Sequence, residues 1–265
     1  MSALTSTLPT DVLCRVLGFT ALWVCVRLTA SNVVFAHVDP AERVRYGTKS
    51  VIVVHSTFQA VAAVWLVCYD PVIAPLLRQM TERPESLDLA NANSPGVSFL
   101  ATVAAGEFAC QMLHLNAWYE KKSDLLMVGH HTLSAVIWPI AVSANRSHFF
   151  LANMLFYELS TPFMALLFFC KGSKVAYQVL GTLFTLFFLL ARLCTVPMTL
   201  YAFYLSWGTW AVLSAPGTVP WVGKGILLLE KVAVPLPILL NLFWGKQVVG
   251  GYLKAIRKDR KPKAT

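Results

Sequence analysis

Charged residues are scarce in this chain. Lys, Arg, Asp and Glu together make up 13% of its 265 residues, whereas soluble domains carry about 25%. Hydrophobic residues account for 57%, and the mean hydropathy is +0.61. Apolar stretches long enough to cross the hydrocarbon core of a bilayer recur along the sequence. The shortage of charge argues against a soluble globular domain, and the recurring apolar stretches predict a protein that crosses the membrane several times.

The sequence also lacks the signatures of several enzyme classes. It has no Gly-rich phosphate loop, no GxSxG nucleophile elbow and no HExxH zinc motif. The six cysteines include no CxxC pair, and all fall within apolar stretches, where they are expected to pack as small apolar residues. No linker rich in Gly, Ser or Pro divides the chain. We therefore expect a single membrane domain with neither a disulfide framework nor a zinc site.

The net charge of +9 does not indicate a nucleic-acid partner. Lys and Arg are dispersed between the apolar stretches and concentrated in the C-terminal tail, and no basic face is interleaved with aromatic residues. The membrane surface is the expected partner of these charges, and we expect no nucleic-acid ligand.

Seven apolar segments are each long enough to form a transmembrane helix. Their ranges are 12–35, 51–69, 97–118, 125–143, 149–170, 175–205 and 226–244. Pro197 predicts a kink in the sixth segment, and Pro235 and Pro237 predict a kink or short break in the seventh. The sequence thus predicts an all-α membrane protein, a bundle of about seven transmembrane helices.

The distribution of Lys and Arg predicts how this bundle is oriented. Of the 22 basic residues, fourteen lie on one set of alternate connections, four lie on the other set, and four lie within the segments. Because the cytosolic side of a membrane protein carries the excess of Lys and Arg, the N-terminus is expected in the lumen and the C-terminus in the cytosol.

Several segments carry polar side chains, which are costly in hydrocarbon and normally face the interior of a bundle. In the third segment, Glu107, Gln111 and His114 follow at i, i+4 and i+7 and so share one helical face. The fourth carries the adjacent pair His130 and His131. The others are His55 in the second, Asn153 and Glu158 in the fifth, Arg192 in the sixth, and Glu230 and Lys231 in the seventh. We predict that segments two to six enclose one polar pocket, where hydrogen bonds between helices satisfy these groups.

Each polar group also has a structural alternative. A lone histidine such as His55 or His114 is more often a packing and hydrogen-bonding residue than a ligand. Glu158 and Arg192 are equally well suited to a structural ion pair between neighbouring helices. Lys231 lies near the end of its segment, where a long side chain normally extends toward the membrane surface.

A metal site is not expected. Glu107, His114, His130 and His131 would supply enough ligands for a three- or four-coordinate ion, but their spacing gives no specific support for one. Six histidines with one adjacent pair are also too few for the repeated His boxes of membrane di-iron enzymes. We expect no metal and no other cofactor.

Several stretches, taken in order, resemble the TLC-domain family, which includes the ceramide synthases. They are KSVIVVHSTFQAV, GEFACQM, LLMVGHHTLSAV, ANMLFYELSTPF and LLARLCTVP. The ordered set of HH, ELSTPF and a later R-x4-P is more specific for this family than any one of these motifs alone. The match looks closest to the branch without ceramide synthases, where ELS(T/S)PF is typical. The resemblance implies a first transmembrane helix and cytosolic loop in residues 1–47, a TLC domain of about six helices in 48–250, and a basic cytosolic tail in 251–265.

In the ceramide synthases, paired histidines and acidic residues of the next span take part in acyl transfer from acyl-CoA to a sphingoid amine. At the matching positions, the resemblance makes His130 and His131 the base or nucleophile and Glu158 the acid that orients them. The remaining polar side chains would contact the substrate: His55, Glu107, Gln111, His114, Asn153 and Arg192. The chain departs from the family pattern in having one acid in YELSTPF, and in having Gln111 where many members have Asp.

Two functions fit these observations. The first is a multi-pass protein of the endoplasmic reticulum that acts in membrane lipid homeostasis by binding, sensing or moving lipids in an intramembrane cavity. The alternative is a ceramide-synthase-like lipid N-acyltransferase that uses acyl-CoA as a substrate. A purely structural or cargo-adaptor role is a third reading.

The expected partners are membrane lipids, a second copy of the chain, and coat proteins. The coat proteins are suggested by the final residues KPKAT, which match the KxKxx pattern for retrieval to the endoplasmic reticulum. A solvated basic tail beside the membrane is the equally weighted alternative for this segment.

Overall fold

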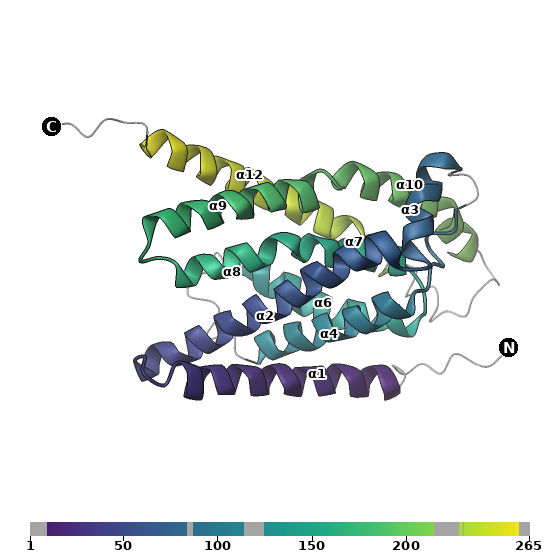
Figure 1. The fold of residues 1–265 in the computed structure, drawn as a ribbon. Helices are drawn as coiled ribbons and strands as arrows, with labels where there is room; N and C mark the ends of the chain where they lie inside the picture. Colours follow the sequence, from purple (N-terminus) through teal and green to yellow (C-terminus); the bar gives the residue numbers. More distant parts are fainter. Residues whose placement is uncertain (1–9, 84–86, 114–124, 215–227, 230, 260–265) are drawn as a thin grey trace.

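The structure is a computed structural model that describes residues 10–83, 87–113, 125–214, 228–229 and 231–259. These ranges contain no strand, and their long helices run side by side in one bundle (Figure 1). The helical segments are α1 (Thr10–Thr29) with the π turn η1 (Ala30–Val34); α2 (Pro40–Tyr69); the short α3 (Ile73–Glu82); α4 (Pro95–Met112); α6 (Leu125–Ser143); α7 (His148–Phe156), the 3-10 turn η4 (Tyr157–Ser160) and α8 (Thr161–Phe169); α9 (Lys174–Phe188), the π turn η5 (Leu189–Leu193) and α10 (Val196–Ser214); and α12 (Pro235–Asp259).

Six of these segments are long and apolar enough to cross a membrane. They are Thr10–Val34, Glu42–Tyr69, Leu125–Ser143, His148–Phe169, Lys174–Gly208 and Lys231–Ala255. Each corresponds to one of the segments predicted from the sequence. The predicted fold class, an all-α helical membrane bundle, is therefore confirmed.

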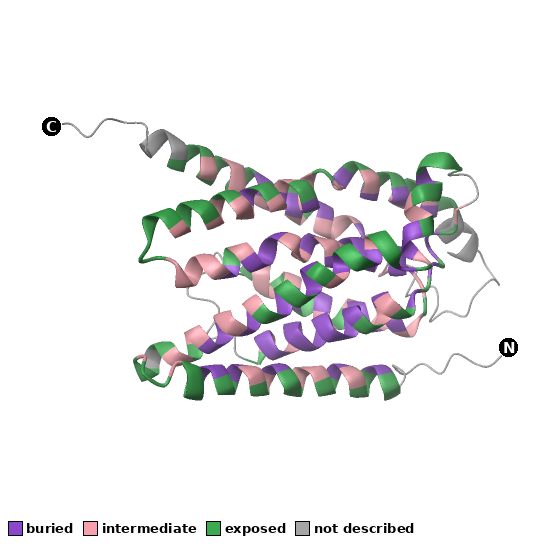
Figure 2. Ribbon diagram, in the orientation of Figure 1, coloured by how far each residue is buried: buried purple, intermediate pink, exposed green. Residues whose placement is uncertain are grey.

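The remaining predicted span is α4, a long helix that is buried along most of its length. It has 18 residues, about 27 Å at the rise of an α-helix, which is slightly less than the ~30 Å thickness of the hydrocarbon core. Figure 2 shows α4 buried along most of its length, and it packs between α1 and α6. Because α4 is shielded from lipid, it can carry Glu107 and Gln111 inside an apolar bundle. Its predicted extension to residue 118 lies outside the described residues.

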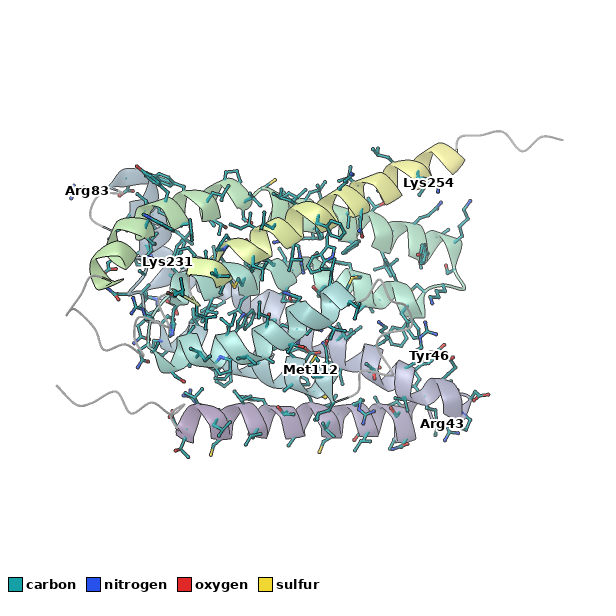
Figure 3. All side chains as sticks on the ribbon, turned by 180° about the vertical axis from the view of Figure 1, so that it is seen from behind. Arg43, Tyr46, Arg83, Met112, Lys231 and Lys254 are labelled. Carbon is teal, nitrogen blue, oxygen red and sulfur yellow. The ribbon has the colours of Figure 1, made fainter. Side chains whose placement is uncertain are left out.

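Basic residues gather at one end of the bundle. In Figure 3, Arg43 and Lys254 lie at this end, whereas Arg83 and Lys231 lie at the other. The start of α2, the turn from α8 to α9 and the end of α12 meet at the first end, and α1 begins at the second (Figure 1). We call the first the basic end; its Lys and Arg residues come from these three elements. Its assignment to the cytosol stays a prediction of the positive-inside rule.

Prolines interrupt the last two segments. Pro197 has no N–H to donate to the carbonyl four residues back. Before it the chain widens into η5, where the N–H of Cys194 donates to the carbonyl of Leu189, five residues back, at 2.9 Å. The predicted interruption is therefore present. Pro235 and Pro237 lie in the first turn of α12, and Val234 forms a turn between this helix and the helical residues 231–233. The predicted short break in the seventh segment is therefore also present.

The six cysteines are all free. Cys110 is buried in α4, as expected for a small apolar residue. Four others are instead exposed on the outside of the bundle: Cys14, Cys25, Cys68 and Cys194. Because this outer surface faces hydrocarbon, a thiol there is still in an apolar environment.

A buried polar cluster joins three of the long helices at the end opposite the basic end. Asp70 Oδ1 accepts the backbone N–H groups two and three residues later, both at 2.9 Å, where the chain turns into α3. Ser94 Oγ donates to Asp70 Oδ2 at 2.7 Å and accepts from Val97 N–H at 3.1 Å, which caps α4. His148 Nδ1 accepts the N–H of Ser94 at 2.8 Å. The end of α2 and the starts of α4 and α7 are thereby fixed to one another.

α1 and α4 approach each other closely at Gly106. A Cβ atom on this residue would lie 2.6 Å from Phe19 Cβ and 2.9 Å from the backbone N of Thr20. Nearby, Trp23 Nε1 donates to the carbonyl of Val103 at 3.3 Å. The contact therefore requires glycine, and it packs α1 directly against α4.

Replacing Gly106 with valine is expected to lower the free energy of unfolding by about 2–3 kcal/mol, because the added side chain overpacks a backbone contact. Gly18→Val is the matched control, since a Cβ atom at Gly18 meets nothing within 4 Å. Its free energy of unfolding should stay within about 0.5 kcal/mol of the wild-type value. Denaturant unfolding in detergent micelles measures both, and equal losses would contradict the close approach.

Candidate functional site

A cavity of about 750 Å³ lies between α2, α4, α6, η4, α8, α9, η5 and α12. We call it the central cavity. Seven of the nine predicted site residues line it: His55, Glu107, Gln111, His130, His131, Glu158 and Arg192. They come from five of the predicted segments, and α12 adds a wall that the sequence did not suggest. The bundle thus brings together polar side chains that are far apart along the chain.

On the α2–α4 side of the cavity, the carboxylate of Glu107 contacts two polar side chains. His55 Nδ1 lies 3.7 Å from Glu107 Oε2, and Gln111 Nε2 donates to Glu107 Oε1. The ring of Trp23 packs edge-on against His55 with centroids 5.2 Å apart. His55 Nε2 and Gln111 Oε1 are buried without a hydrogen-bond partner among the described residues. Because a buried polar atom is costly to leave unpaired, both are suited to bind a polar group in the cavity.

The paired histidines are oriented by aromatic neighbours. The rings of His130 and His131 are 5.4 Å apart. His131 stacks on Phe108 at 5.1 Å with an interplanar angle of 19°, and His130 meets the ring of Trp244 edge-on at 5.6 Å. Both imidazoles line the cavity rather than face lipid. The helix α6 therefore presents two titratable groups to one enclosed space.

Pro162 explains the local backbone around Glu158. Without an N–H, it cannot donate to the carbonyl of Glu158, four residues back. The N–H of Thr161 donates to that carbonyl instead, which tightens the chain into the 3-10 turn η4. The carbonyl of Tyr157, which Thr161 would otherwise bond in an α-helix, is thereby released, and Arg192 Nε donates to it at 3.0 Å. The ELSTP stretch and the later arginine thus form one hydrogen-bonded unit.

The Nη1 and Nη2 groups of Arg192 also donate hydrogen bonds. Its Nη2 donates to Thr161 Oγ1 and its Nη1 to Asn241 Oδ1 of α12, both at 3.3 Å, and the guanidinium lies over the ring of Phe188 at 5.3 Å. Arg192 therefore fastens the fifth, sixth and seventh segments together.

Glu158 is left without a direct partner. Among the described residues, its carboxylate makes no hydrogen bond and no ion pair within 4.0 Å. The structural ion pair between Glu158 and Arg192 is therefore absent, because Arg192 instead binds the released carbonyl of Tyr157. The carboxylate lines the central cavity together with the paired histidines, where it is available to a ligand.

One predicted substrate contact, Asn153, does not line the central cavity. Asn153 donates to Thr199 Oγ1 and, at 3.2 Å, to the Tyr157 hydroxyl. It therefore joins α7 to α10 and makes a structural contact. His114 lies outside the described residues, as does Glu230. Lys231 Nζ lies 5.1 Å from the centre of the Trp207 ring at the end of its segment.

Sequence reasoning missed the basic and aromatic parts of the lining. Arg45 and Lys49 of α2 line the cavity at the basic end. The aromatic residues come from four helices: Phe108, Phe168, Phe184, Phe188, Phe243 and Trp244. Arg45, Lys49, Ile52 and Ser56 follow at i, i+4, i+7 and i+11, which is the spacing of one helical face. This periodicity would have revealed the basic pair, which was counted only as evidence for orientation.

Within the described residues, no group of three or more His, Cys, Asp or Glu side chains is placed to hold a metal ion. The arrangement instead offers hydrogen-bond donors and acceptors on one wall, an aromatic surface on the other, and cationic groups at one end.

Comparison with known proteins agrees with this geometry. The family model of the TLC domain matches residues 45–249. The lining of the central cavity runs from Arg45 to Val248, so the matched range contains the entire lining. TLC domain-containing protein 4 A from Dictyostelium discoideum is 24% identical over 159 residues, which are 58% of this chain. The alignment spans 57% of that relative's length. No solved structure matches the chain.

Arg192→Lys is expected to lower the free energy of unfolding by about 2 kcal/mol. Lysine keeps the charge but cannot reach Tyr157, Thr161 and Asn241 at once, so a buried carbonyl loses its donor. Arg15→Lys is the matched control, because the exposed pair of Arg15 with Asp11 contributes little to stability. Thermal unfolding in detergent measures both variants. Similar stabilities would show that the Arg192 hydrogen bonds do not hold the three segments together.

Proposed function

The chain belongs to the TLC domain family, and we propose that it binds an amphiphilic lipid in its central cavity as part of membrane lipid homeostasis. The observation that carries the proposal is the two-sided lining of this cavity. Imidazole, carboxylate and amide groups line the α2, α4 and α6 side, whereas phenylalanines of α8 and α9 line the other. A molecule with one polar part and one hydrocarbon part can hydrogen-bond to the polar wall and pack against the phenylalanines. Water and a pure hydrocarbon can each make only one of these two kinds of contact.

The cavity lies among helices that cross the membrane, so its ligand arrives from the bilayer or from the membrane surface. Arg45 and Lys49 line the cavity at the basic end. Cationic side chains at this depth attract phosphate or other anionic headgroups. This supports a lipid whose anionic part lies at the basic end and whose chain packs against the phenylalanines.

Lipid sensing and lipid transport are both compatible with such a cavity, and both begin with binding. The endoplasmic-reticulum location and retrieval by coat proteins through KPKAT stay predictions of the sequence, because residues 261–265 lie outside the described residues. The lumenal N-terminus rests on the distribution of Lys and Arg.

Lipid bound to the purified protein tests this proposal. His130→Ala/His131→Ala is expected to lower the amount of co-purified polar lipid by about tenfold, the effect of losing one or two hydrogen bonds to its polar part. His37→Ala is the matched control, since this histidine is exposed and lies outside the cavity. Mass spectrometry of extracted lipid measures the amounts. Full retention in the double variant would remove the paired histidines from the binding site.

Acyl transfer is the second candidate function. The specific observation in its favour is the carboxylate of Glu158, which has no direct partner among the described residues and shares an enclosed space with His130 and His131. An imidazole there can accept the proton of a lipid amine as the new C–N bond forms and the C–S bond of acyl-CoA breaks. The released thiolate then takes up that proton from the imidazole. Until this transfer, the carboxylate of Glu158 stabilises the positively charged imidazole.

Turnover of acyl-CoA with sphingoid bases distinguishes this activity from binding alone. If the protein is an acyltransferase, Glu158→Gln is expected to lower the rate by about 100-fold, the usual contribution of a residue that assists proton transfer. Glu82→Gln, a change of an exposed acid on α3, should leave the rate unchanged. Wild-type protein that binds lipid but shows no turnover above the Glu158 variant would exclude acyl transfer between these substrates and leave lipid binding in place.

A further inference from the structure

A second cavity, of about 350 Å³, lies on the other side of α6, between α6, α7 and α12. We call it the lateral groove. Gly129 and Leu133 of α6, Leu151 and Met154 of α7, and Leu240 of α12 are among its mostly apolar lining. Leu125 and Leu133, at its rim, are 70% and 40% exposed on the lipid-facing surface of the bundle. The groove therefore offers an apolar surface within reach of the bilayer.

His130 and Leu126 line both the lateral groove and the central cavity. A single layer of side chains on α6 therefore separates the two spaces. A third space of about 20 Å³ lies at the same partition. It shares Ser134, Trp138 and Met154 with the groove, and Phe108, Glu158, Arg192 and Trp244 with the central cavity.

Three polar side chains lie at the partition, between the aromatic wall of the central cavity and the aliphatic lining of the groove. His130, Glu158 and Arg192 line the small space, whereas aromatic rings line the central cavity on one side and aliphatic residues line the groove on the other. A lipid with two hydrocarbon chains has the same order, because its ester or amide groups lie where the chains branch. A single-chain amphiphile would leave either the aromatic wall of the central cavity or the groove uncovered.

We propose that the lateral groove binds the second hydrocarbon chain of a two-chain membrane lipid, whose polar branch point lies at His130. The first chain lies against the phenylalanines of the central cavity. This inference rests on lipid binding in the central cavity and adds to it the class of lipid: two chains, with hydrogen-bonding groups at their junction. Movement of the His130 and Leu126 side chains opens the partition to the chain.

Gly129 provides a direct test. It lines the groove, and a Cβ atom there meets nothing within 4 Å, so a larger side chain begins in open space beside the groove. Gly129→Leu is compared with Gly18→Leu, which adds the same side chain to open space on α1. The purified full-length protein in detergent is titrated with phosphatidylglycerol that carries one palmitoyl and one pyrenyldecanoyl chain. Lysophosphatidylglycerol with only the pyrenyldecanoyl chain is the second probe, and energy transfer from tryptophan to pyrene reports binding.

In Gly129→Leu, the Kd of the two-chain probe is expected to rise by about tenfold, because the new side chain excludes roughly two methylene groups of the lipid from the groove. The Kd of the lyso probe should rise by less than about twofold, because this probe has no second chain. Gly18→Leu should change neither value. Equal weakening of both probes, or of neither, overturns the second-chain site while lipid binding in the central cavity stands. If neither probe binds the wild-type protein, lipid binding itself fails and the groove assignment fails with it.

A cross-linking measurement on the wild-type protein does not depend on how a variant folds. A diazirine at the end of the second chain is expected to label peptides of α6, α7 and α12 after illumination. If a second copy of the chain or another protein segment covers the groove, these peptides stay unlabelled and the proposal is wrong.

Discussion

The hydrogen bond from Arg192 to the carbonyl of Tyr157 holds the centre of this protein together. Inside a bilayer no water replaces a lost backbone hydrogen bond, so a released carbonyl needs a donor from the protein itself. Pro162 releases this carbonyl by forcing the 3-10 turn, and the guanidinium that takes it up also reaches Thr161 and Asn241. Because Arg192 donates to this carbonyl, it forms no ion pair with Glu158, and the carboxylate of Glu158 lines the cavity.

The enclosure of α4 has a comparable role on the opposite wall. A helix that carries Glu107 and Gln111 would be unstable against lipid, and α1 shields α4 through the contact at Gly106. Trp23 and Phe108 pack around His55 and His131, so the polar groups are held in fixed orientations. Aromatic packing and close backbone contact thus make a polar cavity possible inside an apolar bundle, and the TLC domain match covers the elements that line it.

Much of this arrangement could be predicted from the sequence, because the membrane imposes simple rules on it. Hydropathy alone located the helices, since every crossing needs a long apolar run. The expectation that buried polar side chains converge also held for seven residues, from His55 to Arg192. It failed for Asn153, which has the same polarity but bonds Thr199 within a helix contact. Polarity shows that a side chain faces protein, but it does not show which neighbour it meets.

The sequence by itself determined the all-α fold class, the positions of the six apolar spans and the presence of polar groups within the bundle, because these depend on composition and local spacing. Tertiary structure decided which acceptor Arg192 binds, that α12 closes the cavity with Trp244, and that His130 lies between the central cavity and the lateral groove. These features depend on contacts between segments separated by dozens of residues. Such contacts are fixed by how the helices pack against one another, and no local pattern in the chain encodes them.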